Sequence, residues 1–230
     1  MNNSDLFLNI IKLGFHAASI DKQTVQEEVD VIKKWSLTYF NNIDSGNLNF
    51  NSAYNPFNRS NSNNISKKKI SDQLKYIYKD VKENTESYHD ILYEIASSNA
   101  FQDNIIINNI PLRYDVLQFI VSIIQADNKI TIEEAKFLFD LKKSLHIDHS
   151  HYTHIINKLI LSLPTIECFI DTIDKIYGLN CYNNKKKTSS ILINQYKFWN
   201  NMTTSQNKFY RDRGEKIILS LAQLKLKYDV

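Results

Sequence analysis

Apolar residues recur at every third or fourth position along most of this 230-residue chain, which is the spacing of amphipathic helices. Residues 5–19 and about 25–40 show it first, and the short connection between them predicts an antiparallel helix pair. The same spacing predicts further helices at about 71–83, 86–98, 111–125, 132–145 and 151–163. Three shorter helical patterns follow at about 166–177, 189–201 and 207–227. No segment alternates cleanly over more than about five residues, so the predicted fold class is all-α.

Two interruptions of this spacing suggest how the chain is organised. Residues 41–66 are rich in Asn and Ser, contain Gly46 and Pro56, and show no period. Together with the start of the next helix they predict a flexible insertion at 41–71. Pro164 ends the helical spacing of the preceding segment and marks a boundary. The predicted domains are therefore 1–163, which contains the insertion, and a small helical region at 164–230.

Composition supports a helical globular protein and indicates its partners and its location in the cell. Only 4 Gly and 3 Pro are present, which leaves few sites for the tight turns of an all-β fold. The net charge of +3 is too small to indicate nucleic-acid binding, so we expect no nucleic-acid partner. Cys168 and Cys181 have no metal-site or disulfide-framework spacing, and the chain shows no secretory leader and no apolar run of about 20 residues. We therefore expect a cytoplasmic protein.

The chain contains two similar acidic turns. In each, an aspartate is followed seven positions later by a glutamate that opens an amphipathic helix, first as Asp21 with Glu28 and then as Asp127 with Glu134. A shift of 106 residues superposes the two copies and their apolar flanks. This pattern predicts an internal duplication of the helical bundle.

The acidic turns have two interpretations. Thr131 and Glu134 have the spacing of a capping box, and Thr24 with Glu27 offers the same in the first copy, one residue out of register. Alternatively, the duplicated fold brings four carboxylates together on a divalent cation that prefers oxygen ligands, such as Ca²⁺, Mg²⁺ or Mn²⁺. The candidate metal ligands are Asp21, Glu28, Asp127 and Glu134.

A histidine cluster is the second candidate metal site. Four histidines lie within nine residues, namely His146, His149, His151 and His154. The three-residue spacing of the last two can place both imidazoles on one ion, with Zn²⁺ as the expected metal. The other interpretation is a polar connection between helices that is rich in histidine.

The second acidic turn resembles the motif of the tellurite-resistance TerB-like domain. That motif has an apolar helix, then Ala-Asp-Gly-x-(Ile/Val), then an acidic helix start. Here 126–130 read Ala-Asp-Asn-Lys-Ile, and Ser19-Ile20-Asp21 is the weaker copy. Lys22 and Asn128 stand where the motif has glycine, and asparagine adopts the left-handed backbone more easily than lysine. The resemblance covers residues 1–163.

This resemblance implies an all-helical, internally duplicated bundle in a stress-response complex near the inner membrane. It also implies that an acidic surface binds partners or metal ions. The function we expect is a non-enzymatic stress-associated module that binds a protein partner and, at the acidic turns, a divalent metal ion. Its expected location is the cytoplasm, with peripheral association at the inner membrane as a further possibility.

Two alternatives to this function are kept. Residues 171–228 faintly resemble the J-domain of TerB-containing DnaJ-like co-chaperones, through 174–179, 195–197 and 215–226. The His-Pro-Asp tripeptide with which a J-domain stimulates its chaperone is absent, so this alternative is a J-like adaptor without that activity. The other alternative is a metal-dependent hydrolase that uses the acidic turns. The lysine runs 67–69 and 185–187 are interpreted as solvated, with contact to anionic lipid or nucleic acid as the alternative.

Overall fold

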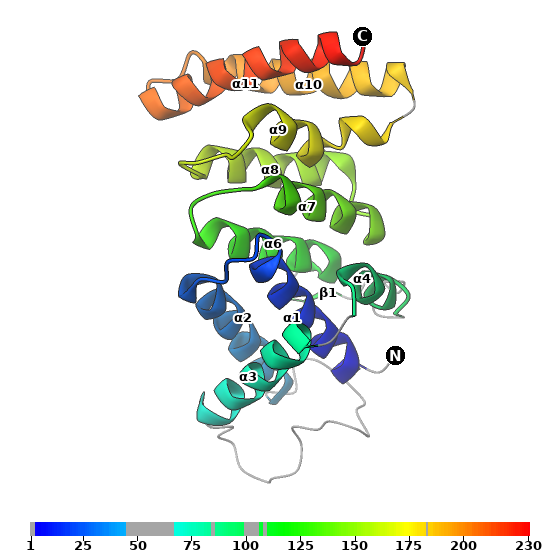
Figure 1. Ribbon diagram of the computed structural model, residues 1–230, viewed down its shortest axis with the longest axis vertical. Helices are drawn as coiled ribbons and strands as arrows, with labels where there is room; N and C mark the ends of the chain where they lie inside the picture. Colours follow the sequence, from blue (N-terminus) through cyan, green and yellow to red (C-terminus); the bar gives the residue numbers. More distant parts are fainter. Residues whose placement is uncertain (1–2, 45–66, 84–85, 99–105, 108–109, 183) are drawn as a thin grey trace. The chain divides into compact units, whose positions relative to one another are not determined.

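The computed structural model describes residues 3–44, 67–83, 86–98, 106–107, 110–182 and 184–230 (Figure 1). The predicted all-α class is confirmed. The helices are α1 (Asn3–Ser19), α2 (Gln26–Asp44), α3 (Lys67–Glu83), α4 (Tyr88–Ala96), α6 (Leu112–Ala126), α7 (Ile132–Ser144), α8 (His149–Ser162), α9 (Phe169–Tyr177), α10 (Lys185–Met202) and α11 (Lys208–Lys227). A short 3₁₀ turn, η1 (Leu179–Cys181), follows α9, and β1 (Ile106–Ile107) pairs antiparallel with β2 (Ile110–Pro111). Within the described part of the chain, no helix is long and apolar enough to cross a membrane.

Helix boundaries follow the sequence pattern within a few residues, with one difference around the predicted insertion. Helix α2 continues to Asp44 and α3 already begins at Lys67, so both ends of the predicted insertion are helical. Residues 45–66, the remainder of that insertion, lie outside the described residues. Helix α4 begins with a capping box in which Ser87 and Asp90 bond to each other's backbone N–H groups.

The chain forms two compact units. The N-terminal unit comprises 1–127 and 141–148, and the C-terminal unit comprises 128–140 and 149–230. Most of α7 and all of α8 therefore belong with the C-terminal helices. The predicted domain boundary at Pro164, between 1–163 and 164–230, stays a prediction.

In the N-terminal unit, α1 is the central helix and contacts α2, α3, α4 and α6. Its predicted apolar face is buried: Leu6, Ile10, Leu13 and Ala17 are almost completely covered. Helix α2 is held on α6 by Trp35, whose ring stacks on that of Phe119 with centroids 4.4 Å apart. The Trp35 indole N–H also donates to Asp115 over 3.3 Å.

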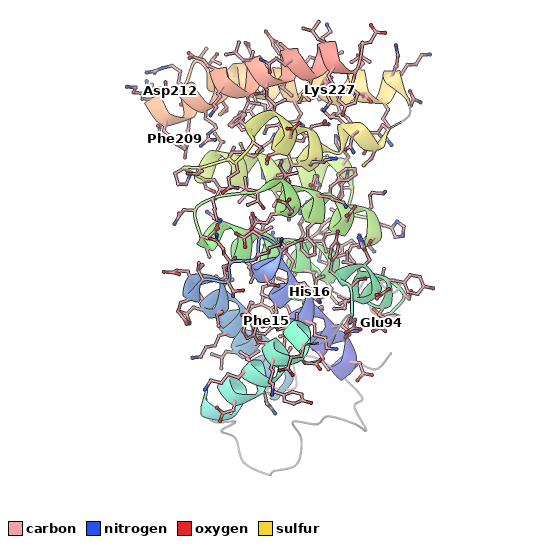
Figure 2. All side chains as sticks on the ribbon, viewed as in Figure 1. Phe15, His16, Glu94, Phe209, Asp212 and Lys227 are labelled. Carbon is pink, nitrogen blue, oxygen red and sulfur yellow. The ribbon has the colours of Figure 1, made fainter. Side chains whose placement is uncertain are left out.

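Polar side chains join the edge of α1 to its neighbours. Asn9 donates to Glu94 on α4 over 2.7 Å, and Lys12 lies 3.0 Å from Glu86. One turn further along α1, His16 is half-buried (Figure 2). Burial lowers the pKa of His16, and the positive charge of Lys12 acts in the same direction. His16 therefore behaves as a core-edge residue that favours its neutral form.

In the C-terminal unit, a buried polar network joins α8, α9 and α10. The Tyr177 hydroxyl donates to the Asn157 Oδ1 atom over 2.6 Å and accepts from the Trp199 indole N–H over 3.1 Å. The amide of Asn157 donates in turn to Gln195 Oε1 over 3.1 Å. All four side chains are buried, and each bond satisfies a polar group that burial would otherwise leave unpaired.

Helices α10 and α11 form an antiparallel hairpin, and α11 also packs on α9 (Figure 1). Near the end of α11, Lys227 and Tyr228 both donate to the buried carboxylate of Asp174 on α9, each over 2.7 Å. Near its start, Arg213 donates to the carbonyl oxygens of Leu163 and Pro164, over 2.6 and 3.0 Å. These contacts at both ends fix the hairpin on the rest of the C-terminal unit.

Candidate functional site

The two acidic turns share the same local backbone. Lys22 and Asn128, the residues in the glycine position of the motif, both adopt the left-handed region, with φ of 68° and 63°. Lysine enters that region at a steric cost and asparagine at a smaller one. The first turn therefore keeps the geometry of the second despite its unfavourable residue.

The glutamates of both turns cap the helices that follow them. Glu134 Oε2 accepts from the backbone N–H of Thr131 over 2.8 Å and from its hydroxyl over 2.9 Å. The Thr131 hydroxyl accepts in return from the Glu134 N–H, which completes the predicted capping box. In the first copy, Glu28 accepts from the Val25 N–H over 2.8 Å. Glu28 rather than the expected Glu27 makes this bond, so the two copies are in register.

These matching bonds support the repeat at the turns themselves, and duplication of the whole bundle stays a prediction. Both capping glutamates are buried, so their carboxylates are directed at the backbone instead of at solvent. Asp21 is half-exposed and accepts from the Gln23 N–H over 2.8 Å, while Asp127 is half-exposed at the end of α6. The compact units also separate the set, because Glu134 belongs to the C-terminal unit and the other three to the N-terminal unit.

The histidine cluster is divided in a similar way. His146 belongs to the N-terminal unit, has a φ of 50°, and ends α7. The Ile147 N–H donates to the Lys142 carbonyl over 3.0 Å, the bond of a left-handed helix C-cap. The other three, His149, His151 and His154, lie on α8 in the C-terminal unit, where the last is exposed.

All eight candidate ligands are among the described residues. Within that part of the chain, no three His, Cys, Asp or Glu side chains are placed to hold a metal ion. Capping accounts for the conformation of Glu28 and Glu134, and metal binding at either cluster stays a prediction.

Capping by Glu134 can be tested by substitution. Glu134→Ala leaves the buried N–H of Thr131 without its acceptor, and we expect the free energy of unfolding to fall by about 1–3 kcal/mol. Glu133→Ala is the matched control, because Glu133 is exposed on the same turn and should change stability by less than about 0.5 kcal/mol. Urea unfolding followed by circular dichroism measures both. Equal losses in the two variants would contradict the buried capping role.

A further site lies on the α10–α11 hairpin, where large apolar side chains are exposed. On α10, Ile193 and Tyr196 expose 52% and 48% of their surface. On α11, Leu219 and Leu226 expose 66% and 82%. Leu219, Ala222 and Leu226 follow i, i+3, i+7 spacing, so they share one face of α11. Clustered exposed apolar residues on a folded protein mark interaction sites.

Leu219 and Leu226 lie outside the lining, whereas Ile193, Tyr196 and Ala222 line a groove of about 490 Å³, called here the hairpin groove. Its apolar lining comes from both helices: Leu192, Ile193 and Tyr196 on α10, and Leu221 and Ala222 on α11. Leu192 and Leu221 are buried and form the floor, whereas Ile193 and Tyr196 are half-exposed walls. The groove is therefore concave and apolar, as ligand-binding surfaces commonly are.

Lysines surround the hairpin groove. Lys197 and Lys225 line it directly. A second hollow of about 460 Å³ shares Ser189, Ile193 and Val230 with it and adds Lys185, Lys186 and Asp229 to the lining. Asp229 is the only acidic residue among the described residues that line either hollow, and its carboxylate lies 2.6 Å from the Lys185 ammonium. With Lys185 paired to Asp229, the rim has a net positive side-chain charge from Lys186, Lys197 and Lys225.

The sequence pattern did not single out this groove. It predicted the helix at 207–227, and Lys185–Lys187 as a basic run, but α11 carries two apolar stripes. The stripe with Ile217, Leu221 and Leu224 is buried, and the stripe with Leu219 and Leu226 is exposed. The sequence signal that could have pointed to an exposed apolar surface was this second apolar stripe on an amphipathic helix.

The fold and the groove define an all-α protein with two compact helical units and an apolar, lysine-rimmed hairpin. Comparison with known protein families, with curated proteins and with solved structures found no match to this chain. The resemblance to TerB-like domains stays a prediction that rests on the residues of the two acidic turns.

Proposed function

We propose that this chain is a non-enzymatic protein-binding module that holds a partner in the hairpin groove. The observation that carries the proposal is the groove itself, with Ile193 and Tyr196 exposed at its walls. Burying such side chains against a partner is favourable by about 25 cal/mol for each Å² of apolar surface removed from water. A few buried aromatic and aliphatic anchors of this kind supply most of the energy of a protein interface.

The wider role we propose is a place in a stress-associated assembly, and its support is the TerB-like motif at the acidic turns. The hairpin groove does not depend on that resemblance. A J-like adaptor role would use the same helices, since α9, α10 and α11 cover the residues that resemble a J-domain. Both roles are forms of protein binding, and the groove is the surface that either would use.

Selection of displayed peptides tests the proposed binding function. A library of random peptides of about 16 residues is selected on the folded wild-type protein, and binders are remeasured on Ile193→Asp. We expect the variant to weaken the selected peptides by about tenfold or more, because an aspartate at a groove wall must be desolvated on binding. Tyr76→Asp is the control, since Tyr76 is exposed on α3 in the N-terminal unit.

The control variant should bind the selected peptides as tightly as wild type. Peptides that bind Ile193→Asp and wild type equally well would place the binding surface elsewhere and reject the proposal. Circular dichroism of each variant confirms that the comparison is made between folded proteins.

A further inference from the structure

We infer that the partner segment of the hairpin groove is an acidic amphipathic helix. The inference rests on the proposed binding function and names the chemical class of its partner. It follows from three properties of the groove: its length, the lack of backbone partners around it, and its charge.

The apolar walls match two turns of a helix. Ser189, Ile193 and Tyr196 lie along one face of α10, and seven residues of helix span about 11 Å. On α11 the lining runs from Leu221 to Lys225, a span of about 6 Å. A partner helix with anchors at i, i+3 or i+4, and i+7 covers the longer of these distances with two turns.

Backbone hydrogen bonding favours a helix over an extended segment. Among the described residues of the C-terminal unit there is no β-strand, so no sheet edge is available to pair with an extended peptide. The groove floor is formed by the apolar side chains Leu192 and Leu221, which offer no backbone partners. A segment that lies on this floor must satisfy its own N–H and C=O groups, and a helix does so internally.

Charge determines which amphipathic helix fits. The two adjoining hollows are lined by Lys186, Lys197 and Lys225 and by the ion pair of Lys185 with Asp229, so their side chains carry a net positive charge. Glutamates and aspartates that flank the apolar anchors of the partner would face these ammonium groups. Such complementarity accelerates association, disfavours basic partners, and weakens as salt screens the charges.

The concave shape argues against a membrane surface as the occupant. A bilayer contacts the protruding side of an amphipathic element and inserts its apolar residues among the acyl chains. A groove of about 490 Å³ with a buried floor would stay unfilled in that arrangement, whereas side chains of a helix can enter it. Anionic vesicles are therefore included below as a competing ligand.

Two synthetic peptides of about 16 residues with identical leucine anchors at i, i+3, i+4 and i+7 test the inference. One carries glutamate at the flanking positions and the other carries lysine, and binding is measured by fluorescence anisotropy. We expect the acidic peptide to bind wild type about tenfold tighter or more at about 50 mM salt, and this preference to shrink at about 300 mM. Ile193→Asp should abolish binding of both peptides.

Charge reversal at the rim sharpens this test. Lys197→Glu should weaken the acidic peptide and strengthen the basic one, because Lys197 lines the groove. Lys158→Glu is the matched control: Lys158 is exposed on α8, changes the net charge equally, and lies outside the lining. Lys158→Glu should leave the ratio of the two affinities nearly unchanged.

The outcomes separate this inference from the proposed function. Equal affinities for the two peptides, both lost in Ile193→Asp, would overturn the acidic preference and leave the binding function standing. If neither synthetic peptide binds but library selection yields peptides that depend on Ile193, the helical partner alone would be overturned. Failure of both experiments would overturn both proposals. A membrane would be the ligand instead of a partner helix if neither peptide bound while the protein co-sedimented with vesicles of about 30% phosphatidylserine. That co-sedimentation would have to be lost in Lys197→Glu.

Discussion

Gly178→Ala is expected to lower the free energy of unfolding by about 2–5 kcal/mol. Gly178 ends α9 in the left-handed region with a φ of 65°, which costs a residue with a Cβ about 1–2 kcal/mol. A Cβ at this position would also lie 2.0 Å from the Cζ atom of Phe139. The Phe139 ring is buried with edge contacts to Tyr152 and Tyr182, so it cannot easily move aside.

Two comparisons separate the clash from the backbone cost. Gly14→Ala, in the interior of α1, also brings a Cβ close to a ring, at 2.7 Å from Phe119 Cζ, but at a helical φ. Alanine is there favoured over glycine by about 1 kcal/mol, which offsets part of the clash, so its loss should be smaller. A double-mutant cycle of Gly178→Ala with Phe139→Leu should show coupling, because the smaller side chain removes the ring. Additive losses in chemical denaturation would mean that the ring is not the obstacle.

Tyr177→Phe is expected to lower the free energy of unfolding by about 2–4 kcal/mol. The substitution keeps the ring but removes the hydroxyl that bonds the Trp199 indole N–H and the Asn157 side chain. Both groups are buried, so each loses its partner without access to water. Burial raises the pKa of Tyr177, so the hydroxyl stays protonated and able to donate across the physiological range.

Tyr152→Phe is the matched control for the network. Tyr152 is equally buried, and its hydroxyl donates to a backbone carbonyl, that of Ile176, over 2.8 Å. Loss of this bond, which is not part of the Asn157–Tyr177–Trp199 network, should cost about 1–2 kcal/mol, less than the loss of the Tyr177 hydroxyl. Urea unfolding of both variants, followed by Trp199 fluorescence and by circular dichroism, measures the difference. A smaller effect at Tyr177 than at Tyr152 would show that the network does not stabilise the C-terminal unit.

The helices and the local geometry of the acidic turns could be predicted because they depend on residues close together in sequence. Glu134 and Thr131 are three positions apart, and their capping box forms wherever that helix starts. The sequence did not show which glutamate caps the helix in the first copy, because Glu27 and Glu28 are adjacent. Only the direction of the helix start decides which of them reaches the Val25 N–H. His146 lies at a left-handed helix end, a placement that its spacing from the other histidines did not indicate, and metal binding at the cluster stays a prediction.

The buried network of the C-terminal unit lay beyond sequence reasoning. Asn157, Tyr177 and Gln195 come from three different helices, and each residue alone could equally have been exposed. Which polar groups meet in a core depends on how the helices pack, and helical spacing carries no information about that pairing.

The sequence by itself determined the all-α class, the helix positions and the capping chemistry of the two turns, because spacing and capping are local properties. Tertiary structure decided which of the two apolar stripes of α11 enters the core. Packing against α9 and α10 buries Ile217, Leu221 and Leu224, and this leaves Leu219 and Leu226 exposed on the opposite face of α11. The hairpin groove forms where side chains of α10 and α11 meet, and that meeting depends on how the two helices pack.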